Sequence, residues 1–322
     1  MPHPANRYAL VADIGGTNTR CALAEGRRLV EGTVRRYSNA DYASLDAVLR
    51  SYIEDEGGVD PVAACVAVAG PVQGDRATLT NLDWKIDTAT LTRATRAERV
   101  AILNDLQAEG HALGHIDPAR IRTILPFPVA PIGTTRLVIN VGTGFNAAPI
   151  FEGPGGRIVP PSESGHVNLP VRDESDLSLS RFAGAARSCP SVEDVLSGRG
   201  LEAVYRWLSC ETGSHAAKSA QEIMAGVSDG SDPQAVETGR IVTRLLGAVA
   251  SNLALTQLPF AGVFLVGGVS RALGPNLVAF GFAAAFRDKG RFADFMDNFG
   301  VGVIEDDYAA LTGAAAFIAA EA

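Results

Sequence analysis

The segment Tyr8-Ala-Leu-Val-Ala-Asp-Ile-Gly-Gly-Thr-Asn-Thr-Arg20 decides the fold of this chain. Its apolar run from Tyr8 to Ala12 predicts a buried strand, which carries Asp13 into a tight turn at residues 15–18. A second apolar run, Cys21–Ala24, follows directly, and the two runs together predict a β-hairpin. An ordinary glycine-rich hairpin with a surface aspartate is the alternative, and the groups that follow along the chain weigh against it.

The turn has the chemistry of an anion-binding loop. Gly15 and Gly16 let backbone N–H groups approach an anion closely, and Thr17 and Asn18 add side-chain donors. Asp13, at the mouth of the turn, is placed to hold a hydrated Mg²⁺ beside bound phosphates. The segment therefore predicts a phosphate-binding turn with a metal-binding carboxylate.

The composition excludes several classes of partner. At 322 residues and 47% hydrophobic, the chain buries a large core, and its length favours two domains. A net charge of -8 without a basic cluster argues against nucleic acid or an anionic membrane. The longest apolar stretches, Val62–Ala69 and Gly262–Val269, have the length of strands, whereas a bilayer span takes roughly 20 residues. We expect neither nucleic acid nor membrane as a partner.

The N-terminus and the cysteines favour a cytoplasmic protein. Residues 1–7 lack the apolar core of a signal peptide. The four cysteines are scattered, without CxxC or the Cys/His spacing of zinc sites. Cys21 and Cys65 lie in strand-like runs, which predicts buried reduced thiols. Cys189 and Cys210 stand apart from them.

The first third of the chain alternates strands with helical segments. We expect strands at Tyr8–Ile14, Cys21–Ala24, Leu29–Tyr37, Ala63–Val68, Arg76–Leu79 and Val100–Asn104. A helix should begin after Ser44, an N-cap candidate, and run to about Glu54. Three consecutive strands followed by βα units predict a mixed sheet rather than a simple Rossmann unit.

The pattern then begins again. Arg136–Val141 is another apolar strand, followed by a Gly/Thr turn at residues 142–144 and a hairpin partner, Ala147–Phe151. A long helix, Asp232–Leu258, and a strand, Gly262–Val266, come later. This repetition predicts two related α/β lobes, each with one phosphate loop, and a cleft between them.

The expected division of the chain follows from that repetition. A small lobe would comprise residues 1–110 plus 305–322, and a large lobe residues 111–304. The Ala/Gly-rich stretch Tyr308–Ala320 predicts a helix that returns to pack on the first lobe.

Asn104 and Asp105 end a strand and open a helix. A carboxylate at the C-terminal end of a strand in an α/β lobe points to where ligands bind. Asp105 is therefore placed to accept the proton of a substrate hydroxyl, as phosphoryl-transfer enzymes require, and Asn104 to hold a neighbouring hydroxyl. The alternative is that Asp105 only caps the helix, and the phosphate turns on both sides favour the catalytic interpretation.

Three further segments carry suggestive groups. Glu163 and His166 fit polyol recognition, in which carboxylates bind adjacent hydroxyls. The alternative is an ion pair on the surface. A metal site is less plausible, because no further His or Cys stands near them in the sequence. Glu193 lies in what we expect to be a helix ending at Gly198, before a new helix near Leu201, and is placed either to reach a sugar hydroxyl or to cap a helix. A glycine pair at 267–268, after a strand, lets a flat ring such as adenine lie against the backbone.

Together these segments resemble the bacterial glucokinase family, and the similarity runs over nearly the whole chain. The motifs that carry it are Asp13-Ile-Gly-Gly-Thr-Asn18, Gly70-Pro-Val-Gln-Gly-Asp75, Thr80-Asn-Leu-Asp-Trp84, Asn104-Asp105, Gly142-Thr-Gly144, Glu163-Ser-Gly-His166, Glu193-Asp-Val-Leu-Ser-Gly198, Gly267-Gly268 and Phe286-Arg-Asp-Lys-Gly-Arg-Phe292. The resemblance implies a two-lobed actin-like ATPase/sugar-kinase fold with duplicated mixed-sheet lobes and an interdomain cleft. It also implies ATP-dependent phosphorylation of the 6-hydroxyl of glucose, with Mg²⁺, in a homodimer.

The resemblance assigns roles by position. Asp105 would be the catalytic base, and the sugar would be bound by Asn104, Glu163, His166 and Glu193. Contacts to phosphate or its Mg²⁺ would come from Asp13, Gly15, Gly16, Thr17, Asn18, Gly142, Thr143 and Gly144, with Asp13 reaching the metal through water. Gly267 and Gly268 would flank the nucleoside.

The chain departs from the family pattern at five positions. The second turn usually continues Gly-Leu-Gly, but here Phe145 and Asn146 follow Gly144, which bears on nucleotide affinity; Asn tolerates left-handed backbone. Ser162 and Ser164 stand where Gly is common and either narrow the sugar pocket or add donors. Arg199 replaces a usual Pro. The preferred sugar is therefore less fixed than the reaction class.

Other functions stay open. The serines also fit a kinase for another hexose or an amino sugar. A non-catalytic sugar sensor would gain nothing from Asp105, and an actin-like assembly protein would leave Glu163, His166 and Glu193 without a purpose. A ROK kinase or repressor is disfavoured, because its cysteine-rich zinc motif and N-terminal helix-turn-helix are absent from this sequence.

Overall fold

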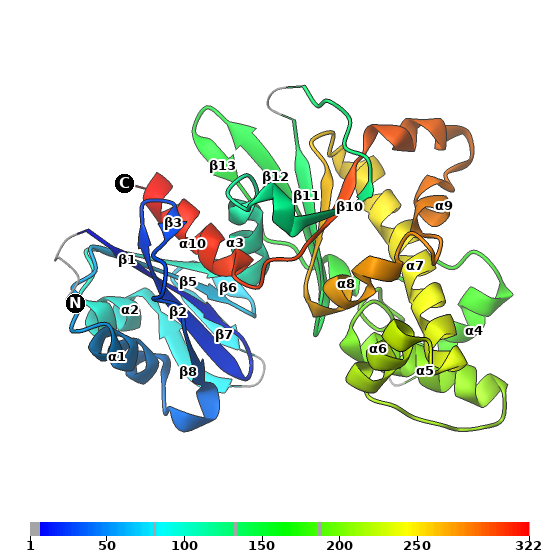
Figure 1. Ribbon diagram of the computed structural model, residues 1–322, viewed down its shortest axis with the longest axis horizontal. Helices are drawn as coiled ribbons and strands as arrows, with labels where there is room; N and C mark the ends of the chain where they lie inside the picture. Colours follow the sequence, from blue (N-terminus) through cyan, green and yellow to red (C-terminus); the bar gives the residue numbers. More distant parts are fainter. Residues whose placement is uncertain (1–6, 80–81, 132–133, 186–188, 322) are drawn as a thin grey trace. The chain divides into compact units, whose positions relative to one another are not determined.

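The computed structural model describes residues 7–79, 82–131, 134–185 and 189–321 (Figure 1). The chain divides into two compact units. Unit 1 comprises the residues up to Pro118 together with those from Asp306 onward, and unit 2 comprises Ala119–Glu305. None of the described helices combines the length and apolarity needed to cross a bilayer.

Unit 1 is built on a mixed sheet with the strand order β3-β2-β1-β5-β9, in which β4 also pairs with β2. The strands are β1 (Ala9–Ile14), β2 (Asn18–Glu25), β3 (Arg28–Leu29), β4 (Arg35–Ser38), β5 (Ala63–Val68) and β9 (Arg99–Asn104). The hairpin β1–β2 is antiparallel, whereas β5 runs parallel to both β1 and β9. A small antiparallel sheet is added by β6 (Val72–Gln73), β7 (Arg76–Leu79) and β8 (Leu82–Asp87). The mixed sheet agrees with the sequence prediction.

Helices cover both faces of this sheet. They are η1 (Asn39–Asp41), α1 (Leu45–Asp55), α2 (Thr88–Thr95), α3 (Asp105–Ala112) and α10 (Ala309–Ala320). Ser44 caps α1 by accepting from Ala47 N at 3.3 Å, as the sequence predicted. The C-terminal helix α10 packs against α3, where a side chain at Gly313 would collide with the carbonyl of Ala108 (Figure 1). The return of the chain end to the first unit is therefore confirmed.

Unit 2 repeats the strand arrangement of unit 1. Its sheet has the order β10-β15-β14-β11-β12-β13, with an antiparallel β11–β12 hairpin and with β14 parallel to both β11 and β15. The strands are β10 (Ile121–Leu125), β11 (Arg136–Val141), β12 (Phe145–Gly153), β13 (Gly156–Ile158), β14 (Val263–Val266) and β15 (Val301–Ile304). The duplicated lobes that the sequence predicted are confirmed.

Unit 2 carries the two longest of the described helices, α5 (Gly198–Glu211) and α7 (Pro233–Gln257). Its other helices are α4 (Glu174–Ala183), α6 (Ala220–Asp229), α8 (Gly268–Leu273) and α9 (Phe282–Arg287). Short 3₁₀ turns complete the chain at η2 (Pro118–Arg120), η3 (Ser164–His166), η4 (Gly274–Asn276), η5 (Gly290–Phe292) and η6 (Asp294–Asn298). The long helix predicted from Asp232 is α7, and its apolar residues enter the large core beneath the sheet.

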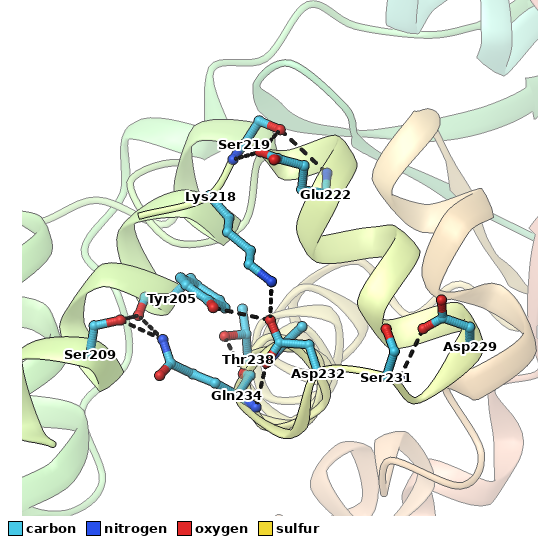
Figure 2. Close-up of polar contacts among 11 residues, drawn as sticks. Tyr205, Ser209, Lys218, Ser219, Glu222, Asp229, Ser231, Asp232, Gln234 and Thr238 are labelled. Carbon is cyan, nitrogen blue, oxygen red and sulfur yellow. Dashed lines mark hydrogen bonds and ion pairs between the residues drawn. The ribbon is translucent and has the colours of Figure 1, made fainter. Parts of the chain in front are cut away.

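One carboxylate ties three of these helices together (Figure 2). Asp232 caps α7, since its Oδ1 accepts from the backbone N of Gln234 at 2.9 Å and of Ala235 at 3.1 Å. Its Oδ2 accepts from Lys218 Nζ, ahead of α6, at 2.7 Å and from Tyr205 OH, on α5, at 3.0 Å. The corner of α5, α6 and α7 is thus fixed by one charged group.

Two predictions of local structure are wrong. The single strand expected over Leu29–Tyr37 is split into β3 and β4, because Gly32 has φ 78° and the Thr33 hydroxyl accepts from Leu23 N and donates to Val30 O. The helix expected before Gly198 is absent: among the described residues, 192–197 form turns and bends, and Ser197 caps α5, which begins at Gly198. Thr80 and the residue after it, part of one family motif, lie outside the described residues.

The cysteines behave as the sequence predicted. Cys21 and Cys65 are buried and unpaired, and burial raises the pKa of each thiol. Cys189 and Cys210 are exposed and unpaired.

Candidate functional site: two glycine turns and their carboxylates

The first glycine turn, residues 15–18, joins β1 to β2. Gly15 N donates to Asn18 O at 3.0 Å, and Asn39 supports the turn by donating from Nδ2 to Gly15 O at 2.8 Å. The N–H groups of Gly16 and Thr17 are exposed and donate to no other described residue. The turn therefore offers open donors of the kind that bind an anion.

Asp13 lies directly below this turn, opposite Arg20 in the hairpin register. Arg20 NH1 donates to Asp13 Oδ2 at 3.2 Å and to the carbonyl of Asp307 at 3.4 Å. Burial raises the pKa of the Asp13 carboxyl, and the neighbouring guanidinium opposes that rise. Sequence reasoning did not single out Arg20. The signal for it is the hairpin register, which pairs position 13 with position 20.

Asn104 and Asp105 stand at the end of β9, on the same edge of the sheet as Asp13, because β1, β5 and β9 are parallel. Asn104 is the helix cap: its Oδ1 accepts from Leu106 N at 3.0 Å, and Gln107 Oε1 accepts from Asn104 N at 3.1 Å. Its Nδ2 donates to Gly70 O at 3.0 Å. The alternative in which Asp105 is only the cap is therefore wrong.

The environment of Asp105 tunes its basicity. Burial, assisted by the negative charge of Asp13, raises the pKa of Asp105 to about 6, although the hydrogen bond from Leu106 N to Oδ1 at 2.8 Å opposes that rise. A carboxylate with this pKa is ionised at neutral pH and more basic than an ordinary aspartate. Both properties suit a general base.

The second glycine turn, Gly142–Gly144, joins β11 to β12 in unit 2. Gly142 N donates to Gly144 O at 2.9 Å, and Gly198 N, at the start of α5, donates to Gly142 O at 2.8 Å. The N–H groups of Thr143 and Gly144 donate to no other described residue. This turn too offers open donors.

Gly267, at the end of β14, lies against the second turn. Its φ of 92° is left-handed, and a side chain there would collide with Val141 O and with Asn140 Oδ1. That buried Asn140 oxygen accepts no hydrogen bond in the described part of the chain. A Cβ at Gly268 would meet nothing within 4 Å. The glycine pair is thus closed toward the sheet and open on its other side, as a flat ligand lying on the backbone requires.

Glu193 connects the second turn to the segment that carries Glu163. Its Oε2 accepts from Phe145 N at 3.0 Å and would lie 2.5 Å from a Cβ at Gly144. Its Oε1 accepts from Arg199 NH2 at 3.0 Å, and its backbone N donates to Gly165 O at 2.9 Å. Glu193 is not a helix cap, so that alternative is wrong.

Glu163 and His166 flank the 3₁₀ turn η3. Their side chains are 67% and 61% exposed, and Glu163 Oε2 lies 4.0 Å from His166 Nε2. Among the described residues, no three His, Cys, Asp or Glu side chains gather as a metal site would need. Both side chains are accessible to a polar ligand.

Within each unit the structure gathers the residues that the sequence singled out. Unit 1 holds Asp13, the first turn, Asn104 and Asp105, with the charge of Asp13 acting on Asp105. Unit 2 holds the second turn, the glycine pair, Glu193 and the segment of Glu163 and His166. Duplicated mixed sheets with glycine turns define the class as the actin-like ATPase and sugar-kinase fold.

Comparison with known proteins identifies the family within that class. The glucokinase family model matches residues 10–321. The chain is 32% identical over 313 residues to the glucokinase of Saccharophagus degradans, covering 96% of this chain and 97% of that protein. A solved glucokinase from an Antarctic psychrotroph aligns with a TM-score of 0.85 and 29% identity, covering 97% and 98% of the two chains. A ROK family glucokinase from Streptomyces griseus, solved with glucose and AMPPNP, shares the fold with a TM-score of 0.65 and 20% identity, over 96% and 98%. The chain belongs to the glucokinase family.

Proposed function

We propose that the protein transfers the γ-phosphoryl group of ATP to the 6-hydroxyl of glucose. The observation that carries the proposal is Asp105: a partly buried carboxylate with a pKa raised to about 6, at the end of β9 on the same edge of the sheet as Asp13. The choice of glucose and ATP is supported by the family and by the glucose and AMPPNP bound to the Streptomyces griseus relative.

In the proposed reaction, Asp105 accepts the proton of the 6-hydroxyl as that oxygen attacks the γ-phosphorus in line with the leaving oxygen of ADP. The open N–H groups of both glycine turns and the guanidinium of Arg20 stabilise the charge that spreads over the phosphoryl oxygens. The proton ends on the carboxylate of Asp105 and is released to solvent after transfer. Within each unit, these groups are held by the hydrogen bonds of the folded chain, so they need little local reorganisation during the reaction.

Sugar binding in this proposal uses carboxylates and amides that bridge adjacent hydroxyls. Asn104, Glu163, His166 and Glu193 take this role, with Gly267 and Gly268 beside the nucleoside. The side chain of Asn104 already caps α3 and donates to Gly70 O, so it meets the sugar in a fixed orientation. Glu193 is held by the hydrogen bond from Phe145 N to its Oε2, and Arg199 occupies its Oε1.

Asp13 fits a magnesium ion. Of the two carboxylate oxygens of Asp13, Arg20 bonds to Oδ2, so Oδ1 is left as a hard oxygen ligand below the first turn. Mg²⁺ in phosphoryl-transfer sites is commonly held by one or two carboxylates, water and the substrate phosphates. Bound through water by Asp13, it would neutralise phosphate charge. We further propose that the enzyme is cytoplasmic and homodimeric, with functional lobes at residues 1–110 plus 305–322 and 111–304.

The experiment is sugar-dependent release of ADP from MgATP. Glucose, mannose, fructose, glucosamine and N-acetylglucosamine are compared, and the product is identified as the 6-phosphate. We expect glucose to give the highest kcat/KM. A higher value for an amino sugar would move the specificity and keep the chemistry, whereas no release with any of them, alongside measurable glucose binding, would contradict the proposal and favour a sugar sensor.

A further inference from the structure

Asn146, on β12, directs its side chain toward residues 162–164. Its Oδ1 accepts from Ser164 N at 3.0 Å and from Ser164 Oγ at 3.2 Å, and its Nδ2 donates to Ser162 O. The one further bond of the side chain is local, from Ala147 N to Oδ1 at 2.9 Å. Both polar atoms of the Asn146 amide therefore form hydrogen bonds to residues 162–164.

Those residues belong to the segment 162–166, which we call the sugar loop because it carries Glu163 and His166. Ser162 and Ser164 are the two chain neighbours of Glu163, so Asn146 fixes the backbone immediately before and after that side chain. Gly165 is packed so closely on the carbonyl of Phe145 that a side chain there would collide with it, and Gly165 O accepts from Glu193 N at 2.9 Å. The loop is thus held to β12 at successive points.

The second glycine turn does not depend on Asn146 in the same way. Its described hydrogen bonds run from Gly142 N to Gly144 O, from Gly198 N to Gly142 O and from Phe145 N to Glu193 Oε2. None of these involves the side chain of Asn146. A change at position 146 should therefore leave the open donors of the turn in place and release the sugar loop.

Glu163 and His166 are mostly exposed, so their own packing does little to orient them. Two exposed side chains on an unrestrained loop would lose conformational freedom on binding a ligand, and that loss lowers affinity. A loop already fixed by the amide of Asn146 avoids most of this penalty.

We propose that Asn146 is a positioning residue for the sugar: it fixes the sugar loop through Ser162 and Ser164 and so sets the affinity for the sugar hydroxyls. This inference rests on the proposed function. The inference assigns Asn146 to sugar binding rather than to nucleotide binding. Although Asn146 follows the glycine turn in sequence, its side chain acts on the loop that holds Glu163 and His166.

The test is the steady-state kinetics of Asn146→Ala, with each substrate varied in turn. We expect KM for glucose to rise about five- to tenfold, because the variant loses the three hydrogen bonds to Ser162 and Ser164 and part of that loss appears as lower sugar affinity; kcat and KM for ATP should stay within about twofold of wild type. Ser164→Ala, which removes only the 3.2 Å bond, should raise KM for glucose by about twofold. The control is Asn298→Ala, which removes an exposed amide that donates to Phe295 O in the same unit and should change nothing.

Two results would overturn the inference. A rise in KM for ATP with an unchanged KM for glucose would assign Asn146 to the glycine turn. An unchanged KM for both substrates in Asn146→Ala would leave it without a positioning role. Both results differ from failure of the proposed function, in which the wild-type protein would show no sugar-dependent release of ADP. If the wild type prefers another sugar, the KM for that sugar is measured in place of the KM for glucose.

Discussion

The hairpins β1–β2 and β11–β12 have the same topology, yet the residues beneath their turns differ in kind. Asp13 and Asn140 both stand one residue before the end of the first strand, and the register pairs them with Arg20 and Asn146. Unit 1 thus has a charged pair where unit 2 has two amides. Both turns above them offer open backbone donors.

This difference separates chemistry from positioning. Burial raises the pKa of Asp105 and the charge of Asp13 adds to that rise, so the carboxylate below the first turn tunes a reactive group. Asn146 carries no charge and fixes the backbone of residues 162–164 instead. A duplicated backbone supplies two similar anion-binding turns, and the side chains below them decide what each unit contributes.

Among the variants that test this division between chemistry and positioning, Asp105→Asn should have the largest effect. The amide is isosteric and its oxygen still accepts from Leu106 N, but it cannot take a proton, so kcat should fall by about a thousandfold. Glucose binding, followed by calorimetry, should stay within about twofold. A variant that keeps a tenth of the wild-type kcat would remove Asp105 from the role of base.

The same substitution should stabilise the protein at neutral pH. Folding raises the pKa of Asp105 above its unfolded value, so the penalty for ionising it is absent below about pH 4 and grows until about pH 6. Asp105→Asn lacks that penalty and should be more stable than wild type at pH 7, by up to about 3 kcal/mol, and equal to it at pH 4. Urea unfolding at both pH values measures this; a difference that does not change with pH would contradict the raised pKa.

Asp13→Asn sharpens the comparison, because it gives the first turn the amide that the second turn has. We expect kcat to fall by about a hundredfold, through the loss of the carboxylate that fits Mg²⁺. The acid limb of the pH profile should also move to lower pH, since the charge of Asp13 no longer raises the pKa of Asp105. Asp41→Asn, at an exposed carboxylate of the same unit, is the control. An unmoved limb would show that the two carboxylates are not coupled.

A smaller effect, on stability alone, is expected at the helix corner of unit 2 (Figure 2). Asp232→Ala removes the cap of α7 and the partner of Lys218 and Tyr205, and should lower the free energy of unfolding by about 2 kcal/mol with kcat unchanged at 25 °C. Asp229→Ala, at the exposed last residue of α6, removes only the hydrogen bond from Ser231 N and should cost less than about 0.5 kcal/mol. Equal losses in the two variants would mean that the shared carboxylate adds nothing beyond one exposed hydrogen bond.

Arg199→Ala should have the smallest effect. The guanidinium, 65% exposed, occupies Oε1 of Glu193, and its removal frees that oxygen to accept a sugar hydroxyl. We expect KM for glucose to fall by about two- to fivefold, in keeping with a surface ion pair, and kcat to stay unchanged. A higher KM would mean that Arg199 orients Glu193 for the sugar rather than competing with it.

Local signals in the sequence predicted much of the fold. The apolar runs around Asp13 and Arg136–Val141 marked both hairpins, and their repetition marked the duplicated lobes, which the structure confirms. The family is confirmed as well. The strand expected over Leu29–Tyr37 failed because its break depends on Thr33 bonding to Leu23 in a neighbouring strand.

The site was less predictable where its contacts join distant segments. Asn104 rather than Asp105 caps α3 because the backbone is still extended at Asn104 and becomes helical at Asp105, a boundary that periodicity does not fix to one residue. Asn146 was recognised as a departure from the glycine pattern, but its bonds to Ser162 and Ser164 require the path of the loop after β13. The roles assigned to Glu163, His166 and Glu193 stay predictions.

The pH dependence of kcat for glucose phosphorylation tests the central claim most directly. With MgATP and glucose saturating, wild-type kcat should fall about tenfold per pH unit below about pH 6 and be level above it, because only ionised Asp105 accepts the hydroxyl proton. The residual rate of Asp105→Asn should lack this limb. A wild-type kcat that is flat from pH 5 to 7, or the same limb in the variant, would contradict the assignment of Asp105 as the base.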